Sequence, residues 1–236
     1  MREFLTARWQ DLIMANYEVE PSLLAPRIPA GTELDLNDGK CFVSLVGFVF
    51  LDTRILGVPV PFHVNFEEVN LRFYVKRQTG SETRRAVGFV KEIVPRFAIA
   101  TVARTLYGEP YECWKMSYRR TEVSVAYEWS KGNCNNRLSV EIDENIGIPA
   151  AGSHGEFIME HYWGYTKRTG TRVDEYKVEH PKWDLFSVKN ETIDVDFRGT
   201  YGSEFAFLAY AKPYSVLLAK GSEVSVYRGE TIQDFT

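Results

Sequence analysis

The clearest pattern of polar and apolar positions along the chain lies between Pro61 and Lys76 (PFHVNFEEVNLRFYVK). Read with a period of two, one side carries Val69, Leu71, Phe73 and Val75, and the other carries Glu68, Asn70, Arg72 and Tyr74. Successive side chains of a β-strand point to opposite faces. The alternation therefore predicts a central strand with one buried apolar face and one ordered polar face.

Two arrangements account for a strand of this kind. It can form part of the wall of a closed barrel that encloses a polar cavity. It can also belong to an open sheet whose polar row faces water, which is the commoner origin of such alternation. The pattern alone leaves both arrangements open.

The other periodicities predict a chain made mainly of strands. Strands are expected at Cys41–Leu51, Ala86–Val94, Cys113–Arg120, Thr121–Ser130, Arg137–Ile142, Glu156–Tyr165 and Arg172–His180, with a closing hairpin formed by Pro213–Lys220 and Glu223–Arg228. The first of these (CFVSLVGFVFL) is apolar almost throughout, so we expect it to be buried on both faces.

Helical segments are few. Pro95–Tyr107 (PRFAIATVARTLY) starts with a proline, has alanines in its middle and precedes Gly108, a combination typical of a helix with defined ends. A short turn of helix is expected within Pro21–Pro29 and a second short helix at Glu204–Ala211. With about ten strands and no linker or repeat, the sequence predicts a single mainly β domain over residues 1–236 with antiparallel connections, a large barrel or sandwich.

Composition and charge exclude several classes of function. The net charge of −4 gives no basic surface for nucleic acid or acidic membranes. The three cysteines and four histidines lack the spacing of a metal or redox site, and no phosphate loop, dinucleotide fingerprint or nucleophile elbow occurs. Met1–Gln10 lacks the apolar core of a signal peptide, and the apolar run at Cys41–Leu51 is too short for a membrane span. We expect a cytoplasmic protein without cofactor or metal; the oligomeric state, a homo-oligomer included, stays open.

The polar face of the central strand supplies the candidate site. Glu68, Asn70 and Arg72 can converge there, and the planar guanidinium of arginine suits a carboxylate ligand. The alternative is an internal Glu68–Arg72 ion pair that only stabilises the interior, because buried charges must be paired in either case. Glu92, on the following strand, either faces the same interior or caps the helix that begins near Pro95.

Glu160, His161 and Tyr162 lie in another strand-like run. Alternation places Glu160 and Tyr162 on one face and His161 on the other. A histidine near a carboxylate is a candidate acid–base pair, and a packed strand histidine is the alternative.

Several stretches taken together resemble the DUF2071 or YqjF-like family of unknown function. The resemblance rests on FEEVNLRFYV (66–75), EIVPRFAIATVARTLYGEPY (92–111), EHYWGYT (160–166), EYKVEHPKW (175–183) and KGSEVSVYRG (220–229), and extends from about Trp9 to Arg228. That family is similar in turn to acetoacetate decarboxylase, whose fold is a closed β-barrel around an internal active site. The resemblance therefore implies a closed, acetoacetate decarboxylase-like barrel with a polar cavity, and it adds Tyr111 to the candidate site residues.

The same resemblance argues against Schiff-base chemistry. Acetoacetate decarboxylase uses a lysine pair in a Gly-Tyr-Pro-Lys-Lys run, and the matching run here is Gly108-Glu109-Pro110-Tyr111-Glu112. Neither Tyr111 nor Glu112 can form an imine. Lys115 follows three residues after Glu112, but being a lysine does not by itself make it the missing nucleophile.

These observations lead to two functional hypotheses. In the first, a polar cavity lined by Glu68, Asn70, Arg72, Glu92 and Tyr111 binds a small organic acid or carbonyl compound, with or without turnover by an enzyme lacking a Schiff-base lysine. In the second, the protein is a non-enzymatic ligand-binding or structural protein whose interior polar row is paired with itself. A cavity of several hundred Å3 with an unpaired Arg72 would favour the first, and a filled interior would favour the second.

Overall fold

The computed structural model describes residues 1–97, 110–168 and 172–232. Its strands are β1 (Glu3–Val19), β2 (Glu33–Leu34), β3 (Cys41–Ile55), β4 (Val58–Pro59), β5 (Phe66–Thr79), β6 (Glu82–Val94), β7 (Tyr111–Cys113), β8 (Lys115–Arg120), β9 (Ser124–Lys131), β10 (Cys134–Gly147), β11 (Trp163–Lys167), β12 (Val173–Glu179), β13 (Leu185–Asp194), β14 (Ser215–Tyr227) and β15 (Glu230–Ile232). The helical segments are α1 (Pro21–Leu24), η1 (Ala25–Arg27), α3 (His154–Met159), α4 (Phe197–Tyr201) and η3 (Ser203–Ala209). The prediction of a mainly β chain with few helices is confirmed.

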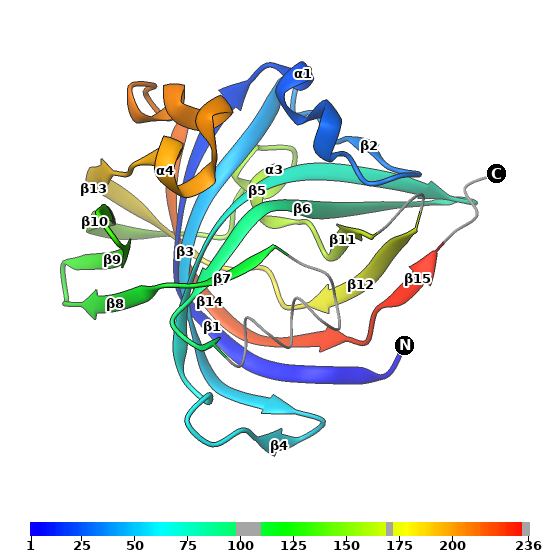
Figure 1. Cartoon of the computed structure of the whole chain (residues 1–236), viewed down its shortest axis with the longest axis horizontal. Coiled ribbons are helices and arrows are strands. Elements are labelled where there is room, and N and C mark those ends of the chain that lie inside the picture. Colours follow the sequence, from blue (N-terminus) through cyan, green and yellow to red (C-terminus); the bar gives the residue numbers. More distant parts are fainter. Residues whose placement is uncertain (98–109, 169–171, 233–236) are drawn as a thin grey trace.

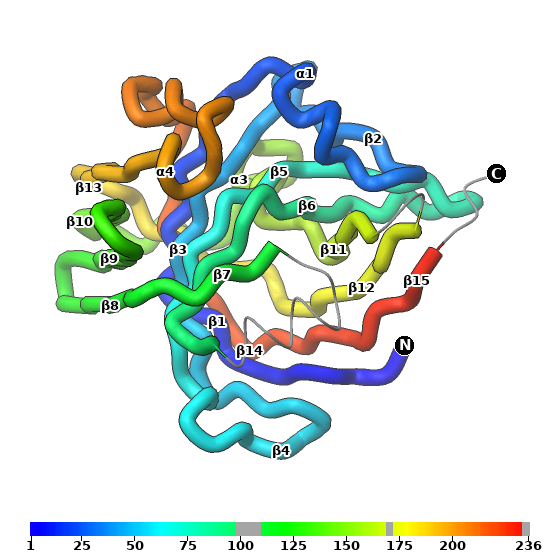
Figure 2. The backbone as a smooth tube through the Cα atoms, viewed as in Figure 1, coloured from blue at the N-terminus to red at the C-terminus, as the bar shows by residue number. Residues whose placement is uncertain are grey.

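The strands form one large sheet whose pairings return on themselves (Figure 1). The order runs β12–β11–β6–β5–β3–β1–β14, and β14 pairs again with β12, so these strands make a ring of pairings. β13, β10, β9 and β8 continue from β14 as a wing, which Figure 2 shows on the side away from the N-terminus. The ring is the part of the fold that holds the cavity described below.

The sheet is mixed, so the prediction of a wholly antiparallel sheet is wrong. β6 pairs in parallel with β7 through Glu92↔Tyr111 and with β11 through Trp163↔Ala86. A parallel pair needs a crossover of a dozen or more residues, and residues 95–110 connect β6 to β7. Such crossovers leave no periodic signal in the strands themselves.

The two-faced strand predicted from the sequence is β5. Val69, Leu71, Phe73 and Val75 are all at most 1% exposed and belong to one apolar core. Phe73 packs so closely on β6 that a Cβ added at Gly88 would lie 2.6 Å from its Cζ. The neighbouring strand β3 is buried from Cys41 to Phe50, so its predicted burial on both faces is also confirmed.

The strand expected at Glu156–Tyr165 is wrong in its first half, which forms helix α3. The Ser153 side chain accepts a hydrogen bond from the backbone N–H of Glu156 (3.2 Å), and the Glu156 carboxylate accepts one from Gly152 N (2.7 Å). A serine followed three residues later by a glutamate is a capping signal for a helix N-terminus. Burial of Phe157, Ile158 and Met159 then fixes the helix against the ring.

The closing hairpin expected from Pro213 to Arg228 is also wrong. Ser215–Tyr227 forms the single strand β14, which pairs with β1 along most of its length. Gly221 has a φ of +80°, and a Cβ there would lie 2.1 Å from the carbonyl oxygen of Trp9. The glycine therefore permits a close approach of two paired strands and does not mark a turn.

The remaining helix predictions divide into two groups. The turn within Pro21–Pro29 is present as α1 and η1, and the short helix expected at Glu204–Ala211 is present as η3. The helix expected at Pro95–Tyr107 lies outside the described residues beyond Phe97. In the described parts of the chain, no helix combines the length and apolar character that crossing a bilayer requires.

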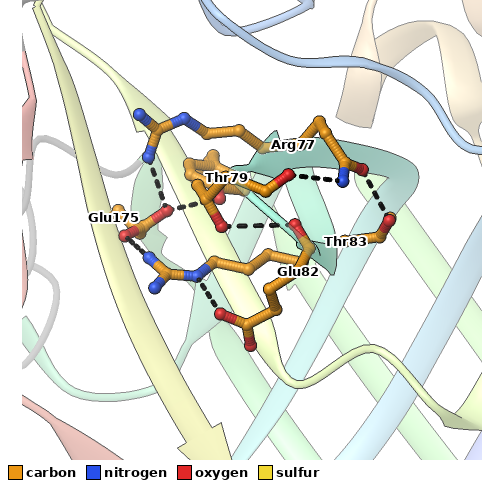
Figure 3. A network of polar contacts seen from close by, with 9 residues as sticks. Arg77, Thr79, Glu82, Thr83 and Glu175 are labelled. Carbon is orange, nitrogen blue, oxygen red and sulfur yellow. Dashed lines mark hydrogen bonds and ion pairs between the residues drawn. The ribbon is translucent and has the colours of Figure 1, made fainter.

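A network of charged side chains ties β5 and β6 to β12 (Figure 3). Glu175 on β12 accepts hydrogen bonds from Arg77 (3.1 Å) on β5 and Arg84 (2.5 Å) on β6. The hydroxyl of Tyr165 donates to the same carboxylate. Glu175 is 5% exposed, so this buried carboxylate has cationic partners on both of its oxygens.

Candidate functional site

The ring of strands lines a cavity of about 240 Å3 that is partly open to solvent. Its wall includes the aromatic residues Trp9, Phe48, Phe50, Phe66, Trp163 and Trp183 and the polar residues Glu68, Asn70, Arg72, Glu92, Tyr111 and His161. All five candidate residues from the sequence thus line one cavity. The strand pairing explains why they meet: β5 places Asn70 opposite Glu92, and the parallel β6–β7 pair places Glu92 beside Tyr111.

Glu68 is a buried carboxylate in the cavity wall. It is 2% exposed, and its two oxygens accept hydrogen bonds from Asn70 Nδ2 (2.9 Å) and from the Tyr111 hydroxyl (3.0 Å). Both donors are neutral. Glu68 therefore holds Asn70 and Tyr111 in place along the cavity wall.

Arg72 makes different contacts from those of the predicted ion pair. Its Nη2 donates to the carbonyl oxygen of Ile158 (3.2 Å) and contacts Met14 Sδ at 3.5 Å, and its guanidinium lies 5.5 Å from the centroid of the Tyr74 ring. Among the residues that the structure describes, no ion-pair partner of Arg72 is present, and its buried Nε has no hydrogen-bond partner. The alternative of an interior Glu68–Arg72 ion pair is not what the structure contains.

Glu92 faces the cavity and is 2% exposed. Its backbone N–H donates to the carbonyl oxygen of Pro110 (3.2 Å), which continues the parallel contact with β7. The helix that Glu92 would alternatively cap lies outside the described residues. The Glu92 side chain lines the same cavity as the polar row of β5.

His161, which the sequence suggested as part of an acid–base pair but not as a cavity residue, lines the same cavity. It follows α3, and its Nε2 lies 3.1 Å from Asp35 Oδ2. Asp35 Oδ2 also accepts a hydrogen bond from Arg85 Nε (2.7 Å). Burial lowers the pKa of His161 to about 4, and the positive charges of Arg85 and Arg72 act in the same direction, although Asp35 opposes them. The ring is therefore neutral at pH 7.

The proposed alternation around His161 needs one correction. The Tyr162 hydroxyl donates to Glu160 (2.6 Å), so these two residues do lie together, but the carboxylate partner of His161 is Asp35, 126 residues away in the sequence. The capping pattern that starts at Ser153 was the available signal that residues 154–159 form a helix. No local pattern identifies Asp35 as the partner.

Several buried polar atoms in the cavity wall have no hydrogen-bond partner among the described residues. They include Trp9 Nε1, Thr53 Oγ1, Asn70 Oδ1, Arg72 Nε and His161 Nδ1. Buried polar side-chain atoms in folded proteins usually have partners, so a group of them around one cavity calls for an explanation. The polar row is therefore paired with itself only in part: Glu68 accepts hydrogen bonds from Asn70 and Tyr111, whereas Arg72 Nε has no partner among the described residues.

Much of the remaining wall is apolar and aromatic. The Trp9 ring contacts Phe48 and Phe50 with ring centroids 5.0 and 5.7 Å apart. The His180 ring stacks on Trp183 at 3.9 Å, and burial lowers the pKa of His180. The cavity can therefore hold an apolar or aromatic group beside a polar head.

The residues that align with the decarboxylase lysine pair differ in their location. Tyr111 lines the cavity, whereas Glu112 pairs with Lys91 (2.8 Å) and Lys131 (2.9 Å). Burial opposes ionisation of Glu112, but hydrogen bonds from Lys91, Trp114 and Lys131 outweigh it and lower its pKa to about 2. The cavity wall contains no lysine among the described residues, and Lys115 is exposed on β8. In the same described part of the chain, no cluster of side chains is arranged to hold a metal ion.

Known proteins resemble this chain at two levels. Residues 6–223 match the DUF2071 family, described as an uncharacterized conserved protein. The uncharacterized protein YqjF of Bacillus subtilis is 35% identical over 217 residues, which cover 89% of this chain and 88% of YqjF.

The solved structures share the fold at low sequence identity. Acetoacetate decarboxylase from Legionella pneumophila superimposes with a TM-score of 0.68 at 11% identity, covering 98% of this chain and 88% of the decarboxylase. The enduracididine biosynthesis enzyme MppR, complexed with pyruvate, gives a TM-score of 0.66 at 14% identity, covering 100% and 93% of the two chains. These likenesses show an acetoacetate decarboxylase-like fold. On the family match and the relationship to YqjF, the chain belongs to the DUF2071 family.

Proposed function

We propose that the cavity binds a small organic acid or carbonyl compound and that Arg72 anchors the acid group. The observation that supports this proposal is a half-buried guanidinium that lines a largely apolar cavity and has no carboxylate partner in the described residues. A cation in such surroundings is costly unless an anion compensates it. A ligand carboxylate supplies that compensation and matches the planar guanidinium.

The size and composition of the cavity support a small ligand. A volume of about 240 Å3 lies below the range of about 300–1,000 Å3 found for drug-sized ligands. Glu68, Asn70, Tyr111 and Glu92 provide polar contacts near Arg72, and Trp9, Phe48 and Phe50 accept an apolar remainder. In this proposal the ring of strand pairings acts as a barrel-like wall that separates the ligand from water, and the protein works in the cytoplasm.

The structural relatives support the same ligand class. MppR has been solved with pyruvate and with the condensation product of pyruvate and imidazole 4-carboxaldehyde. The pyruvate complex supports a small carbonyl acid as the class of ligand proposed here. Binding here proceeds without an imine, because the described cavity wall offers no lysine.

The test begins with a thermal-shift screen of 2-oxo and 2-hydroxy acids, since a ligand that binds only the native state raises its stability. Calorimetric binding of the best acid is then compared between the wild type and Arg72→Met. Loss of a charge-assisted hydrogen bond should cost about 1.5–3 kcal/mol, or roughly ten- to a hundredfold in affinity.

Arg77→Met serves as the matched control. Arg77 lies on the same strand but bonds to Glu175 outside the cavity, so this variant should lose stability and keep its affinity. Equal affinities of the wild type and a folded Arg72→Met protein would contradict the proposal.

A further inference from the structure

The Asp35–His161 contact fixes which nitrogen of the His161 ring carries the proton. Burial opposes ionisation of Asp35, but hydrogen bonds from His161 and Arg85 outweigh it and lower the Asp35 pKa. An ionised carboxylate only accepts hydrogen bonds, so His161 Nε2 must donate to it. Because the neutral ring has a single proton, Nδ1 bears a lone pair.

The lone pair belongs to the edge of the ring that does not face Asp35. His161 lines the cavity, whereas Asp35 does not. The two nitrogens of an imidazole point away from each other, so the edge that faces away from Asp35 carries Nδ1. The His161 side chain is only 1% exposed, and Nδ1 has no hydrogen-bond partner in the described chain. A buried acceptor without a donor is costly.

His161 and Arg72 both belong to the cavity wall and share a neighbour, Tyr74. Both flank the Tyr74 ring: the His161 ring centroid lies 4.7 Å from it and the Arg72 guanidinium 5.5 Å. Arg72 also bonds to the carbonyl of Ile158, three residues before His161. Burial is the main cause of the lowered pKa of His161, and the charge of Arg72 makes a smaller contribution in the same direction.

We propose that His161 Nδ1 accepts a hydrogen bond from a hydroxyl group of the ligand, so that the cavity prefers hydroxy acids to acids without a hydroxyl group. This inference rests on the proposed binding of an acid through Arg72. A carbonyl oxygen has no hydrogen to donate, so a ligand with only an oxo group leaves Nδ1 unpaired. Asp35 and Arg85 act as positioning residues, because they hold the tautomer without lining the cavity.

The probes are 3-phenyllactate and 3-phenylpropionate, which share a carboxylate and an aromatic ring and differ by one hydroxyl group. The aromatic ring suits the wall formed by Trp9, Phe48 and Phe50. Calorimetry at pH 7.5 should show 3-phenyllactate binding to the wild type at least about tenfold more tightly. The Arg72→Met substitution should lower the affinity for both acids to a similar extent.

Two substitutions separate the acceptor from the Asp35 contact. Glutamine at position 161 can still donate to Asp35 but places no acceptor where Nδ1 was, so His161→Gln should bind the two acids with equal affinity. Asparagine places its amide oxygen near the Nδ1 position and is too short to reach Asp35, so His161→Asn should keep part of the preference. If His161 acted only through its contact with Asp35, His161→Gln should keep the preference and His161→Asn should lose it.

The outcomes distinguish this inference from the proposed function. If neither acid binds the wild type, or if both bind independently of Arg72, the proposed function fails and this inference with it. If both bind through Arg72 with equal affinity in the wild type, only the hydroxyl preference is overturned. The comparison of the two acids in the wild type tests the hydroxyl preference even if a variant at position 161 does not fold.

Discussion

Two arginines on the same strand have opposite surroundings. Arg72 and Arg77 lie five residues apart on β5, so their side chains leave opposite faces of the sheet. Arg77 shares the Glu175 carboxylate with Arg84, and the Tyr165 hydroxyl completes the network (Figure 3). Arg72 faces a cavity, bonds to a carbonyl oxygen and has no ion-pair partner among the described residues.

The difference separates charge that is paired within the fold from charge that has no counter-charge among the described residues. Removing one member of a paired, buried network leaves its partners uncompensated. An arginine that has no carboxylate partner to abandon should cost little stability when it is replaced. The lack of an anion, more than burial itself, distinguishes the candidate site from the structural network.

The largest effect is expected at Phe73, the neighbour of Arg72 on the opposite face of β5. Phe73 is 1% exposed in the core, so Phe73→Ala should lower the free energy of unfolding by about 3–5 kcal/mol, measured by urea denaturation. A loss below about 1 kcal/mol would mean that the two faces of β5 are wrongly assigned.

The paired arginines are tested through their shared carboxylate. Glu175→Gln should cost about 3 kcal/mol, because it leaves Arg77 and Arg84 without a counter-charge in a partly buried site. The variant should keep wild-type affinity for any acid that binds in the cavity, because Glu175 does not line it. An unchanged stability would remove the structural half of the comparison.

The stability of the protein should decrease as the pH is lowered through a range set by His161. The unfolded chain binds a proton at this histidine below pH 6.5, whereas the folded protein resists protonation until about pH 4. The contribution of His161 to the free energy of unfolding is therefore fully present above pH 6.5. It decreases as the pH falls toward 4, by up to about 3 kcal/mol.

The matched variant for this pH dependence is His161→Gln. The lowered pKa values of His154 and His180 act in the same direction and remain in the variant, so the difference between the two proteins isolates His161. Urea unfolding at several pH values between 4 and 7 should give a shallower slope for His161→Gln. Equal slopes would show that His161 is not buried in its neutral form.

Replacement of Arg72 should have a small effect on stability. Methionine keeps much of the volume of the arginine stem, so Arg72→Met should change the free energy of unfolding by less than about 1 kcal/mol. The double variant Glu68→Gln/Arg72→Met should show additive effects within about 0.5 kcal/mol, because no ion pair joins the two residues. A loss of about 3–5 kcal/mol that the double variant restores would instead establish a Glu68–Arg72 pair.

Covalent trapping should produce no effect at all. Incubation with acetoacetate and borohydride should leave the protein unlabelled by mass spectrometry, since Tyr111 and Glu112 occupy the positions of the decarboxylase lysines. A specific reduced adduct on any lysine, Lys115 included, would show that an imine forms after all.

The part of the site that β5 contributes could be predicted from the sequence, whereas the parts that other strands contribute could not. Alternation along β5 placed Glu68, Asn70 and Arg72 on one face, because strand geometry alone decides which side chains lie together. The resemblance supplied Tyr111, whose approach to Glu92 depends on a parallel pair that crosses over residues 95–110. Long-range register of this kind has no local signal.

The missed elements have identifiable physical causes. The apolar run at Phe157–Met159 fits a strand or a helix, and the cap at Ser153 decides for the helix. The partnership of Asp35 with His161 and that of Arg77 with Glu175 span 126 and 98 residues. Such contacts arise only when the ring of strands assembles, so the sequence did not indicate which arginine would be left without a carboxylate.

A crystal structure with the tightest acid from the screen tests the central claim most directly. The account predicts the acid inside the ring, with a carboxylate oxygen within about 2.7–3.2 Å of an Arg72 nitrogen. An acid bound elsewhere, or an Arg72 side chain turned to pair with Glu68 while the acid occupies the cavity, would contradict it.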